Sequence, residues 1–463
     1  MPRPNILIVT THDSGRHFGC YGVPTVQTPN IDALAADGVL FERMFAASPI
    51  CSPSRGALLT GRYPLANGLV GLAGGVWNWE FNDYKQHLSH IARNAGYDTR
   101  MFGFQHETSH IERMGFTDTT KHGIKDGDKT KTAVDVAADV AEFLQSRGDE
   151  GGPFYAQVGF HETHTRYDFG GCKPEDAKGA WIPPYAKSHG WPEWAVILQR
   201  FGADPGYARN HIAEFQGSLQ SVDRAVGGIM NALRDSGLED NTIVLFNTDH
   251  GPELPGAKWT MYDPGLGIAF ILRWPRGGTC GGRRCDWLLG NVDFLPTLLE
   301  LTGMEGPDDL QGVSFADACR HDVSDCPSPR ETVYGSWVDG LNYAVRTNRY
   351  KLIRNLVPVD STGRVCPEYE LYDLALDPVE LTDVAPEPAY ADVLADLRAR
   401  MDDWLEQMGD PVVDGPIDGE THQEKLAEYR RRYETKHGVD GNKGQVSGRP
   451  GHPSGETGGR KSP

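Results

Sequence analysis

The sequence predicts an α/β protein with a mostly parallel sheet, because buried strand-like runs alternate with segments of helical period. The apolar runs lie at residues 6–10, 154–160, 242–247 and 268–274. Candidate helices lie between them at 31–36, 84–95 and 212–233. Ligands in such sheets bind beyond the carboxyl ends of the strands. The residues that follow each run are therefore candidates for a functional site.

The pattern changes after about residue 330, where strand pairs at 343–346 and 350–356 precede one amphipathic helix. Apolar residues recur in that helix at three- and four-residue spacing: Leu394, Leu397, Met401, Trp404, Leu405 and Met408. We expect a large domain over 1–330, a smaller α+β subdomain over 331–412 and a polar extension over 413–463. A charged helix is expected at 423–436, and roughly the last 25 residues are predicted to be disordered.

The composition limits the classes of partner. The 463 residues include 64 acidic and 45 basic side chains, for a net charge of -19, which argues against a surface for nucleic acid or anionic membranes. No apolar stretch reaches the roughly 18 to 20 residues of a membrane span, and no signal segment is recognisable. The eight cysteines have no disulfide or metal-knuckle rhythm, which is typical of a reducing compartment. We therefore expect a cytoplasmic protein.

The most informative stretch is residues 51–62, which read CSPSRGALLTGR. Cys51 is followed by Pro53 and Arg55 at the predicted start of a helix. Unpaired N–H groups and the positive end of the helix dipole favour an anion at that place. Arg55, one turn later, can point to the same spot. A lone cysteine before proline is most often a turn residue, so the whole string carries the inference.

This string resembles the C-x-P-S-R signature of type I sulfatases, whose cysteine is oxidised to formylglycine by a dedicated enzyme that reads the proline and the arginine. Further stretches resemble the family in the same order, up to about residue 412: 1–22, 28–35, 241–251, 345–353 and 370–378. The resemblance implies an alkaline-phosphatase-like fold with helices on both faces of the sheet. It also implies a sulfatase catalytic domain over 1–330 that hydrolyses sulfate esters or sulfamates.

The resemblance assigns a divalent cation to five residues. Asp13 and Asp249 match its carboxylate ligands, and His250 and Cys51 complete the set. His12 stands where a second aspartate is usual, and it is either a ligand or a neighbour that packs beside the site. Hard oxygen ligands favour calcium, with magnesium as the next choice. The imidazole of His12 raises the expectation for manganese and, to a lesser degree, zinc.

The resemblance also assigns catalytic roles to His106, His164 and Lys258, besides Cys51 and Arg55. His106 matches the histidine of a G-K-x-H motif, which takes a proton from the nucleophile. His164 matches a histidine at the leaving group, and Lys258 matches a lysine that binds sulfate. A histidine or lysine at such a position can also be structural or solvated.

One family lysine is missing, because Phe104 occupies its place in the stretch that reads GFQH. A cationic contact to the sulfate is therefore lost. Arg16, His17 or a group of the substrate would have to replace it.

Among sulfatases, the likeness is greatest to N-sulfoglucosamine sulfohydrolases (sulfamidases). It rests on the step from Asp13 to Gly19, on the F-H-x-x-H string and on GPELPG at 251–256. It implies a small sulfated saccharide as substrate and a formylglycine-generating enzyme as partner for maturation. Residues 168–194 are expected to border the pocket. Two alternatives remain: a phosphonate monoester or phosphodiester hydrolase of the same superfamily, and a homologue made inactive by the changes at His12 and Phe104.

Overall fold

The computed structural model describes residues 3–74, 78–122, 131–147, 151–164, 205–254, 256–324, 326–338, 341–356 and 366–409, together with Glu424. Three expectations therefore lie outside the described residues: the pocket loop at 168–194, the disordered tail and, apart from Glu424, the charged helix at 423–436. Among the described helices, none combines the length and the apolar character that crossing a membrane requires.

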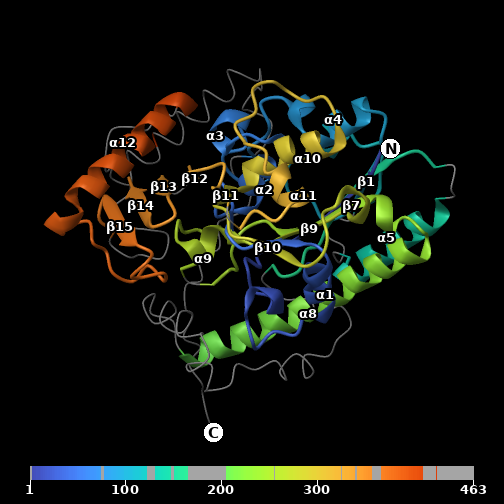
Figure 1. Cartoon of the computed structure of the whole chain (residues 1–463), viewed down its shortest axis with the longest axis horizontal. Coiled ribbons are helices and arrows are strands. Elements are labelled where there is room, and N and C mark those ends of the chain that lie inside the picture. Colours follow the sequence, from blue (N-terminus) through green and yellow to red (C-terminus); the bar gives the residue numbers. More distant parts are fainter. Residues whose placement is uncertain are drawn as a thin grey trace, which may run out of the picture.

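The central sheet has eight described strands in the order β10-β2-β9-β7-β1-β6-β4-β5 (Figure 1). Their bounds are β1 Asn5–Thr11, β2 Val39–Phe41, β4 Asp98–Gly103, β5 Asp118–His122, β6 Phe154–Gly159, β7 Thr242–Thr248, β9 Phe270–Arg273 and β10 Arg283–Cys285. Strands β7, β1, β6, β4 and β5 are parallel neighbours, whereas β9 runs antiparallel to β7 and β2. The mostly parallel sheet expected from the sequence is confirmed.

Helices cover both faces of this sheet (Figure 1). One face carries α1 Pro29–Asp37, α5 Ala133–Ser146 and α8 Pro205–Asp235; the other carries α2 Cys51–Thr60, α4 Leu88–Asn94, α10 Phe294–Thr302 and α11 Ala316–Arg320. Side chains of β1 alternate between the two cores, with Ile6 and Ile8 in one and Leu7 and Val9 in the other. Both faces of a parallel strand are buried, which explains its continuous apolar run.

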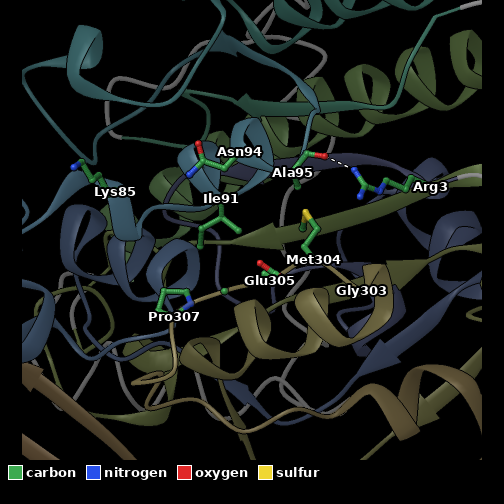
Figure 2. A pocket seen from close by; sticks show the side chains of 10 residues that line it. Arg3, Lys85, Ile91, Asn94, Ala95, Gly303, Met304, Glu305 and Pro307 are labelled. Atoms are coloured by element: carbon green, nitrogen blue, oxygen red, sulfur yellow. Dashed lines mark hydrogen bonds between the residues drawn. The ribbon is translucent and has the colours of Figure 1, made fainter.

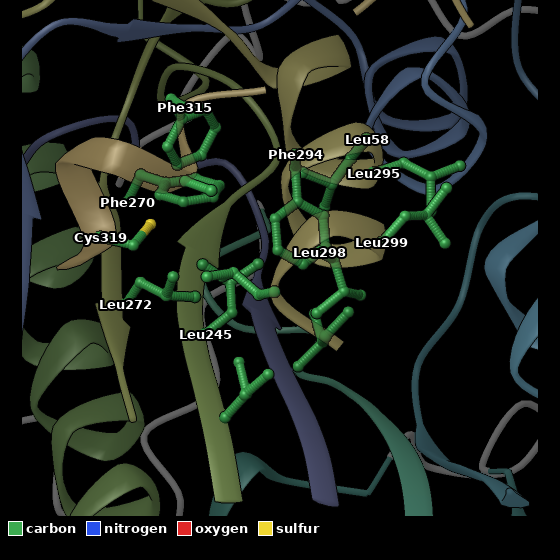
Figure 3. Packing of buried hydrophobic residues seen from close by; sticks show 14 of the residues in the cluster. Leu58, Leu245, Phe270, Leu272, Phe294, Leu295, Leu298, Leu299, Phe315 and Cys319 are labelled. Atoms are coloured by element: carbon green, nitrogen blue, oxygen red, sulfur yellow. The ribbon is translucent and has the colours of Figure 1, made fainter. Parts of the chain in front are cut away.

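The core beneath α2 and α10 is shown in Figure 3, where Leu58 and Phe294 pack beside Leu245 of β7 and Leu272 of β9. Burial of these side chains holds α2 against the sheet.

The remaining short elements are α3 Pro64–Asn67, α9 Asp263–Leu266, the strands β3 Met44–Phe45, β8 Gly267–Ile268 and β11 Leu289–Gly290, and the 3₁₀ helices η1 Gly19–Tyr21, η2 Tyr84–Gln86, η3 Ile111–Arg113, η6 Glu239–Asn241, η7 Pro275–Gly277, η8 Asn291–Asp293 and η9 Pro388–Tyr390.

Two predicted elements are divided in the structure. The run 84–95 consists of η2 and α4, because His87 has extended backbone and its Nδ1 accepts the Ser89 N–H at the start of α4. The run 268–274 is split between β8 and β9, which belong to different sheets. Ala269 lies between them, and its N–H donates to the carbonyl of Gly15, 2.9 Å away.

The C-terminal part forms a four-stranded antiparallel sheet, β12 Val333–Trp337, β13 Asn342–Arg346, β14 Tyr350–Asn355 and β15 Tyr369–Asp373, with α12 Ala391–Met408 beside it (Figure 1). The Trp404 ring of α12 stacks on Tyr334 of β12 at 4.8 Å. The expected α+β character of this part is confirmed. The boundaries at residues 330 and 412 stay predictions.

Candidate active site and metal site

Four neighbouring parallel strands, β7, β1, β6 and β4, end in register at one edge of the sheet. Thr10 of β1 pairs with Asn247 of β7 and with Gly159 of β6. Gly159 in turn pairs with Gly103 of β4. Each strand is followed within a few residues by candidates for the site: Asp249 and His250, His12 and Asp13, His161 and His164, and Phe104 and His106. The parallel register thus gathers residues that are far apart in the sequence.

The five residues predicted to hold a cation lie together. His12, Asp13, Cys51, Asp249 and His250 are all buried, and each offers one ligand atom within 4.8 Å of those of the others. The thiol Sγ of Cys51 lies 3.3 Å from Nε2 of His250 and 3.8 Å from Nδ1 of His12.

Backbone groups orient both carboxylates. Asp249 Oδ1 accepts the N–H groups of Asp13 and His250, both at 2.9 Å, which leaves Oδ2 facing Nδ1 of His12 at 3.3 Å. Asp13 has a positive φ of 47°, an uncommon backbone conformation for this residue type. Burial acts to raise the pKa of Asp13, but nearby cationic groups, Lys258 first among them, hold that pKa well below its usual value.

The two imidazoles present nitrogen atoms to the same place. Nδ1 of His250 lies 2.8 Å from the carbonyl oxygen of Gly251, and since a carbonyl only accepts, Nδ1 carries the proton and Nε2 keeps its lone pair. Nε2 of His250 lies 3.1 Å from Asp13 Oδ1, and Nδ1 of His12 lies 2.6 Å from the same oxygen. Burial lowers the pKa of His12 to about 3, so its ring is neutral.

This donor set fits a divalent cation. Two carboxylates, two neutral imidazoles and the side chain of residue 51 direct lone pairs into one buried volume, where they repel each other unless a positive charge lies between them. His12 thus lies close enough to belong to the donor set, and its role as a ligand stays a prediction. The donor set does not select one metal.

Cys51 is the first residue of α2, as the sequence predicted. The preceding Ile50 has extended backbone, and no side chain among the described residues caps the helix start. All ten residues of α2 are buried. Ser54 donates its hydroxyl to the carbonyl of Asp249, and Asn291 donates to the carbonyl of Ser54 at 2.9 Å. These bonds fix the helix start against the end of β7.

Arg55 lies between two buried carboxylates. Its Nε donates to Asp249 Oδ2 at 3.0 Å, and its Nη1 lies 4.0 Å from Oε1 of Glu107. The guanidinium carbon lies 5.3 Å from the centre of the Phe104 ring. Nη2 is buried and has no hydrogen-bond partner within the described part of the chain. Arg55 therefore has an N–H group to offer an anion.

His106 is held in one tautomer. Its Nε2 lies 3.0 Å from the carbonyl oxygen of Ala73 and so donates to it, and the N–H of Ala73 in turn donates to the Ser52 hydroxyl at 3.0 Å. Nδ1 has no hydrogen-bond partner among the described residues. Burial, reinforced by Arg55, lowers the pKa of His106 to about 4. The ring is thus neutral with a lone pair on Nδ1.

Lys258 and His164 both lie beside the donor cluster. The Lys258 ammonium donates to Asp13 Oδ2 at 2.6 Å and to Glu253 Oε2 at 3.3 Å. The His164 ring meets the His12 ring edge to face at 4.9 Å, and His164 forms a second group of ligand-type side chains with Asp13 and Glu253. The structure thus brings Cys51, Arg55, His106, His164 and Lys258 around one cluster.

Arg16 and His17 do not replace the missing lysine. Arg16 donates to the carbonyl of Met44 at 3.2 Å and lies over the Phe45 ring at 4.7 Å. His17 pairs with Gln216 at 3.1 Å. The structure instead shows Phe104 under the guanidinium of Arg55.

Two acidic residues that the sequence analysis left out contact the catalytic set. Glu107 is 1% exposed and lies beside Arg55, and Glu253 holds Lys258. The available signals were their positions, directly after His106 and within GPELPG. Neither position in the sequence shows by itself which basic side chain the carboxylate contacts.

A separate pocket of about 520 Å³ lies at the opposite end of β1 (Figure 2). It is lined by Arg3, which donates to the carbonyl of Ala95, and by Lys85 and Glu305. A strand of seven residues separates Arg3 from the cluster, a distance of roughly 23 Å at about 3.3 Å per residue. The pocket does not belong to the site.

Comparison with known proteins agrees with this architecture. Residues 4–304 match the sulfatase family model, and residues 257–407 match the model described as N-sulphoglucosamine sulphohydrolase, C-terminal. Human N-sulphoglucosamine sulphohydrolase is 26% identical over 91% of this chain and 93% of its own length. An ulvan-active sulfatase of Formosa agariphila is 27% identical over 88% of this chain and 76% of its own.

Solved structures show the same fold. A putative sulfatase from Bacteroides fragilis superimposes with a TM-score of 0.72 at 24% identity, over 89% of this chain and 97% of that one. A protein in complex with its substrate D-glucosamine-2-N,6-O-disulfate gives 0.69 at 22%, over 89% and 99%. The phosphonate monoester hydrolase of Agrobacterium radiobacter gives 0.63 at 23%, over 86% and 96%.

The central sheet and its two layers of helices give this chain the alkaline-phosphatase-like fold that the solved sulfatase structures share. Because the family model spans residues 4–304, the chain belongs to the sulfatase family. It is a sulfamidase-like type I sulfatase, and members of this group hydrolyse sulfuric esters or sulfamates.

Proposed function

We propose that this sulfatase removes sulfate from a small sulfated sugar of the N-sulfoglucosamine type, with residue 51 as nucleophile. The observation that carries the proposal is the position of Cys51, at the start of α2 and within 4.8 Å of the ligand atoms of Asp13 and Asp249. The sugar class is supported by the family model matched at 257–407 and by the human relative.

Asp13, Asp249, His250, His12 and residue 51 would hold the divalent cation, for which calcium is the first expectation, followed by magnesium or manganese and last zinc. When bound, the cation would neutralise sulfate oxygens and favour an ionised nucleophile. Formylglycine made from Cys51 by a formylglycine-generating enzyme would supply a hydrated aldehyde at this place.

The chain's own side chains have the remaining tasks. Arg55 and Lys258 present positive charge to the sulfate oxygens. His164, beside Lys258, would give a proton to the departing oxygen or nitrogen. His106 would take a proton at Nδ1, since its Nε2 is already bound to the carbonyl of Ala73. The role of His106 follows from the partner of its Nε2, and the roles of His164 and Lys258 follow from the resemblance to the family.

Replacement of the nucleophile tests the proposal. Cys51→Ala should abolish turnover of N-sulfoglucosamine while the circular dichroism spectrum and the melting temperature stay close to those of the parent. Cys319→Ala is the matched control, because Cys319 is also buried but belongs to α11 and packs in the apolar core. Intact-mass analysis of the active parent should show residue 51 lighter by the difference between a thiol and an aldehyde. An active Cys51→Ala variant would refute the assignment.

Three substrates separate the competing functions. The parent, produced together with a formylglycine-generating enzyme, should turn over N-sulfoglucosamine faster than an aryl sulfate and much faster than an aryl phosphonate. Preference for the phosphonate would favour the phosphonate hydrolase, and loss of all three activities in protein with formylglycine would favour an inactive homologue.

We further propose that the protein works in the cytoplasm. Six described cysteines form no disulfide within the described part of the chain, which supports a reducing compartment: Cys20, Cys51, Cys280, Cys285, Cys319 and Cys326. Cell fractionation with an antibody against the chain tests this location, and recovery outside the cytoplasm would refute it.

A further inference from the structure

Trp259 has a backbone conformation that is rare for a bulky residue. It directly follows Lys258, its φ is +69°, and such left-handed conformations outside glycine cluster at functional sites. The N–H of Trp259 donates to the carbonyl of Pro49 at 3.2 Å. The backbone thus fixes the indole beside the segment that leads into Cys51.

A second indole supports the first. Trp337, the last residue of β12, lies 5.6 Å from Trp259 between ring centroids, at 51°. The neighbouring Ser336 donates its N–H to the carbonyl of Ala47 at 2.9 Å. The segment 47–50 is therefore held near both tryptophans, Trp259 in the loop after β7 and Trp337 in the C-terminal sheet.

The pair combines an apolar surface with a nearby cation. The Lys258 ammonium lies 5.4 Å from the centre of the Trp259 ring, so a molecule whose charged group binds the ammonium would place its next atoms over the indole. A sugar ring has an apolar C–H face beside its polar substituents, and it contacts an aromatic ring at roughly 3.5–4.0 Å. Aromatic walls with few polar groups are typical of sites for small ligands.

We propose that Trp259, supported by Trp337, is the specificity-determining surface on which the sugar ring of the substrate stacks while its sulfate contacts Lys258. This inference rests on the proposed function. It assigns recognition of the saccharide to residues 259 and 337 and recognition of the sulfate to the cluster around residue 51.

One observation distinguishes this role from ordinary packing. Trp259 is only partly buried, whereas Ile50 and Met261 of the same apolar cluster are almost fully buried. The Trp259 side chain therefore keeps exposed surface that a ligand can contact.

Steady-state kinetics test the inference. Trp259→Ala should raise KM for N-sulfoglucosamine about tenfold, while the Ki of inorganic sulfate, which reads only the sulfate contacts, changes by less than about twofold. Trp259→Phe should restore most of the affinity, and Trp337→Phe should raise KM without changing that Ki. The control is Trp287→Phe, because Trp287 packs in another core and its Nε1 donates to the carbonyl of Cys326.

The outcomes are separable. If the parent turns over N-sulfoglucosamine and Trp259→Ala leaves KM unchanged, or raises KM and the sulfate Ki equally, the stacking role is refuted and the proposed function stands. If Trp259→Ala does not fold, Trp259→Leu and Trp337→Phe give the same readout. A parent that turns over no sulfated sugar refutes the proposed function together with this inference.

Discussion

The rings of His12 and Phe104 lie 4.9 Å apart, tilted by 55°. Each stands where the sulfatase resemblance expects a charge, an aspartate at position 12 and a lysine at position 104. Burial keeps His12 neutral, so one negative and one positive charge are lost together and the charge balance of the site is kept. We interpret the two changes as a compensated pair.

The pairing of His12 with Phe104 predicts that substitutions at the two positions change the unfolding free energy non-additively. Phe104→Lys alone should cost about 3 kcal/mol or more of unfolding free energy, because the new ammonium would be buried beside Arg55 without a carboxylate of its own. In a His12→Asp background the same change should cost less by about 1–3 kcal/mol. Urea unfolding of the parent, both single variants and the double variant measures this difference. Phe104→Leu, which removes the ring without adding charge, is the control, and additive free energies would contradict the interpretation.

Removal of the metal should destabilise the protein. With the cation stripped by a chelator, Asp13 and Asp249 are left facing each other and the two imidazoles, so the melting temperature should fall and recover when metal is returned. His12→Asp should shift the ion that restores most stability toward calcium, because a hard oxygen replaces a nitrogen ligand. Thermal melts with calcium, magnesium, manganese and zinc compare the variants. An unchanged order of ions would show that His12 is not a ligand.

Glu107 is predicted to be a positioning residue for Arg55. Its Oε1 accepts from Gln157 at 3.1 Å and lies 4.0 Å from Arg55 Nη1. Burial raises the pKa of Glu107, so Glu107→Gln should cost little stability but lower kcat/KM about tenfold through a less constrained Arg55. Glu80→Gln is the matched control, because Glu80 is a buried carboxylate that binds Ser109 at 2.8 Å without contacting Arg55. Equal losses in the two variants would contradict the positioning role.

Glu380 predicts a dependence of stability on pH. Burial raises its pKa from 4.5 to about 7, although Lys351 lies 2.8 Å away. The folded state therefore binds this proton more tightly than the unfolded state, so the contribution of Glu380 to stability falls as the pH rises from about 5 through 7. Glu380→Gln should remove that part of the slope in urea midpoints between pH 5 and 8. Glu370→Gln, at a buried carboxylate bound to Tyr262, should leave the slope of the urea midpoint against pH unchanged. An identical slope in the parent and both variants would refute the prediction.

Sequence reasoning was effective where a local pattern determines the structure. β7 ends directly before Asp249 and β1 ends two residues before Asp13, and the rule for parallel sheets then places both carboxylates at one edge. The string at 51–55 marks a helix start that the structure confirms as the first turn of α2. These features needed no knowledge of distant contacts.

Features that depend on distant partners could not be predicted in this way. Arg16 follows Asp13 closely in sequence, but positive φ values at Asp13 and Gly15 turn the chain, and Arg16 packs on Phe45. Glu107 gains its role from Arg55 in another element, and Trp259, in the loop after β7, gains its support from Trp337 in the C-terminal sheet. The left-handed backbone conformation of Trp259 cannot be predicted from the pattern of apolar residues.

The complete enclosure of α2 has a consequence for the proposed maturation. Because all ten residues of the helix are buried, a modifying enzyme that reads residues 51–55 would have to act before the helix packs against its neighbours. Under that proposal, a copy that folds first would keep its thiol, and the yield of working enzyme would depend on a race between oxidation and folding.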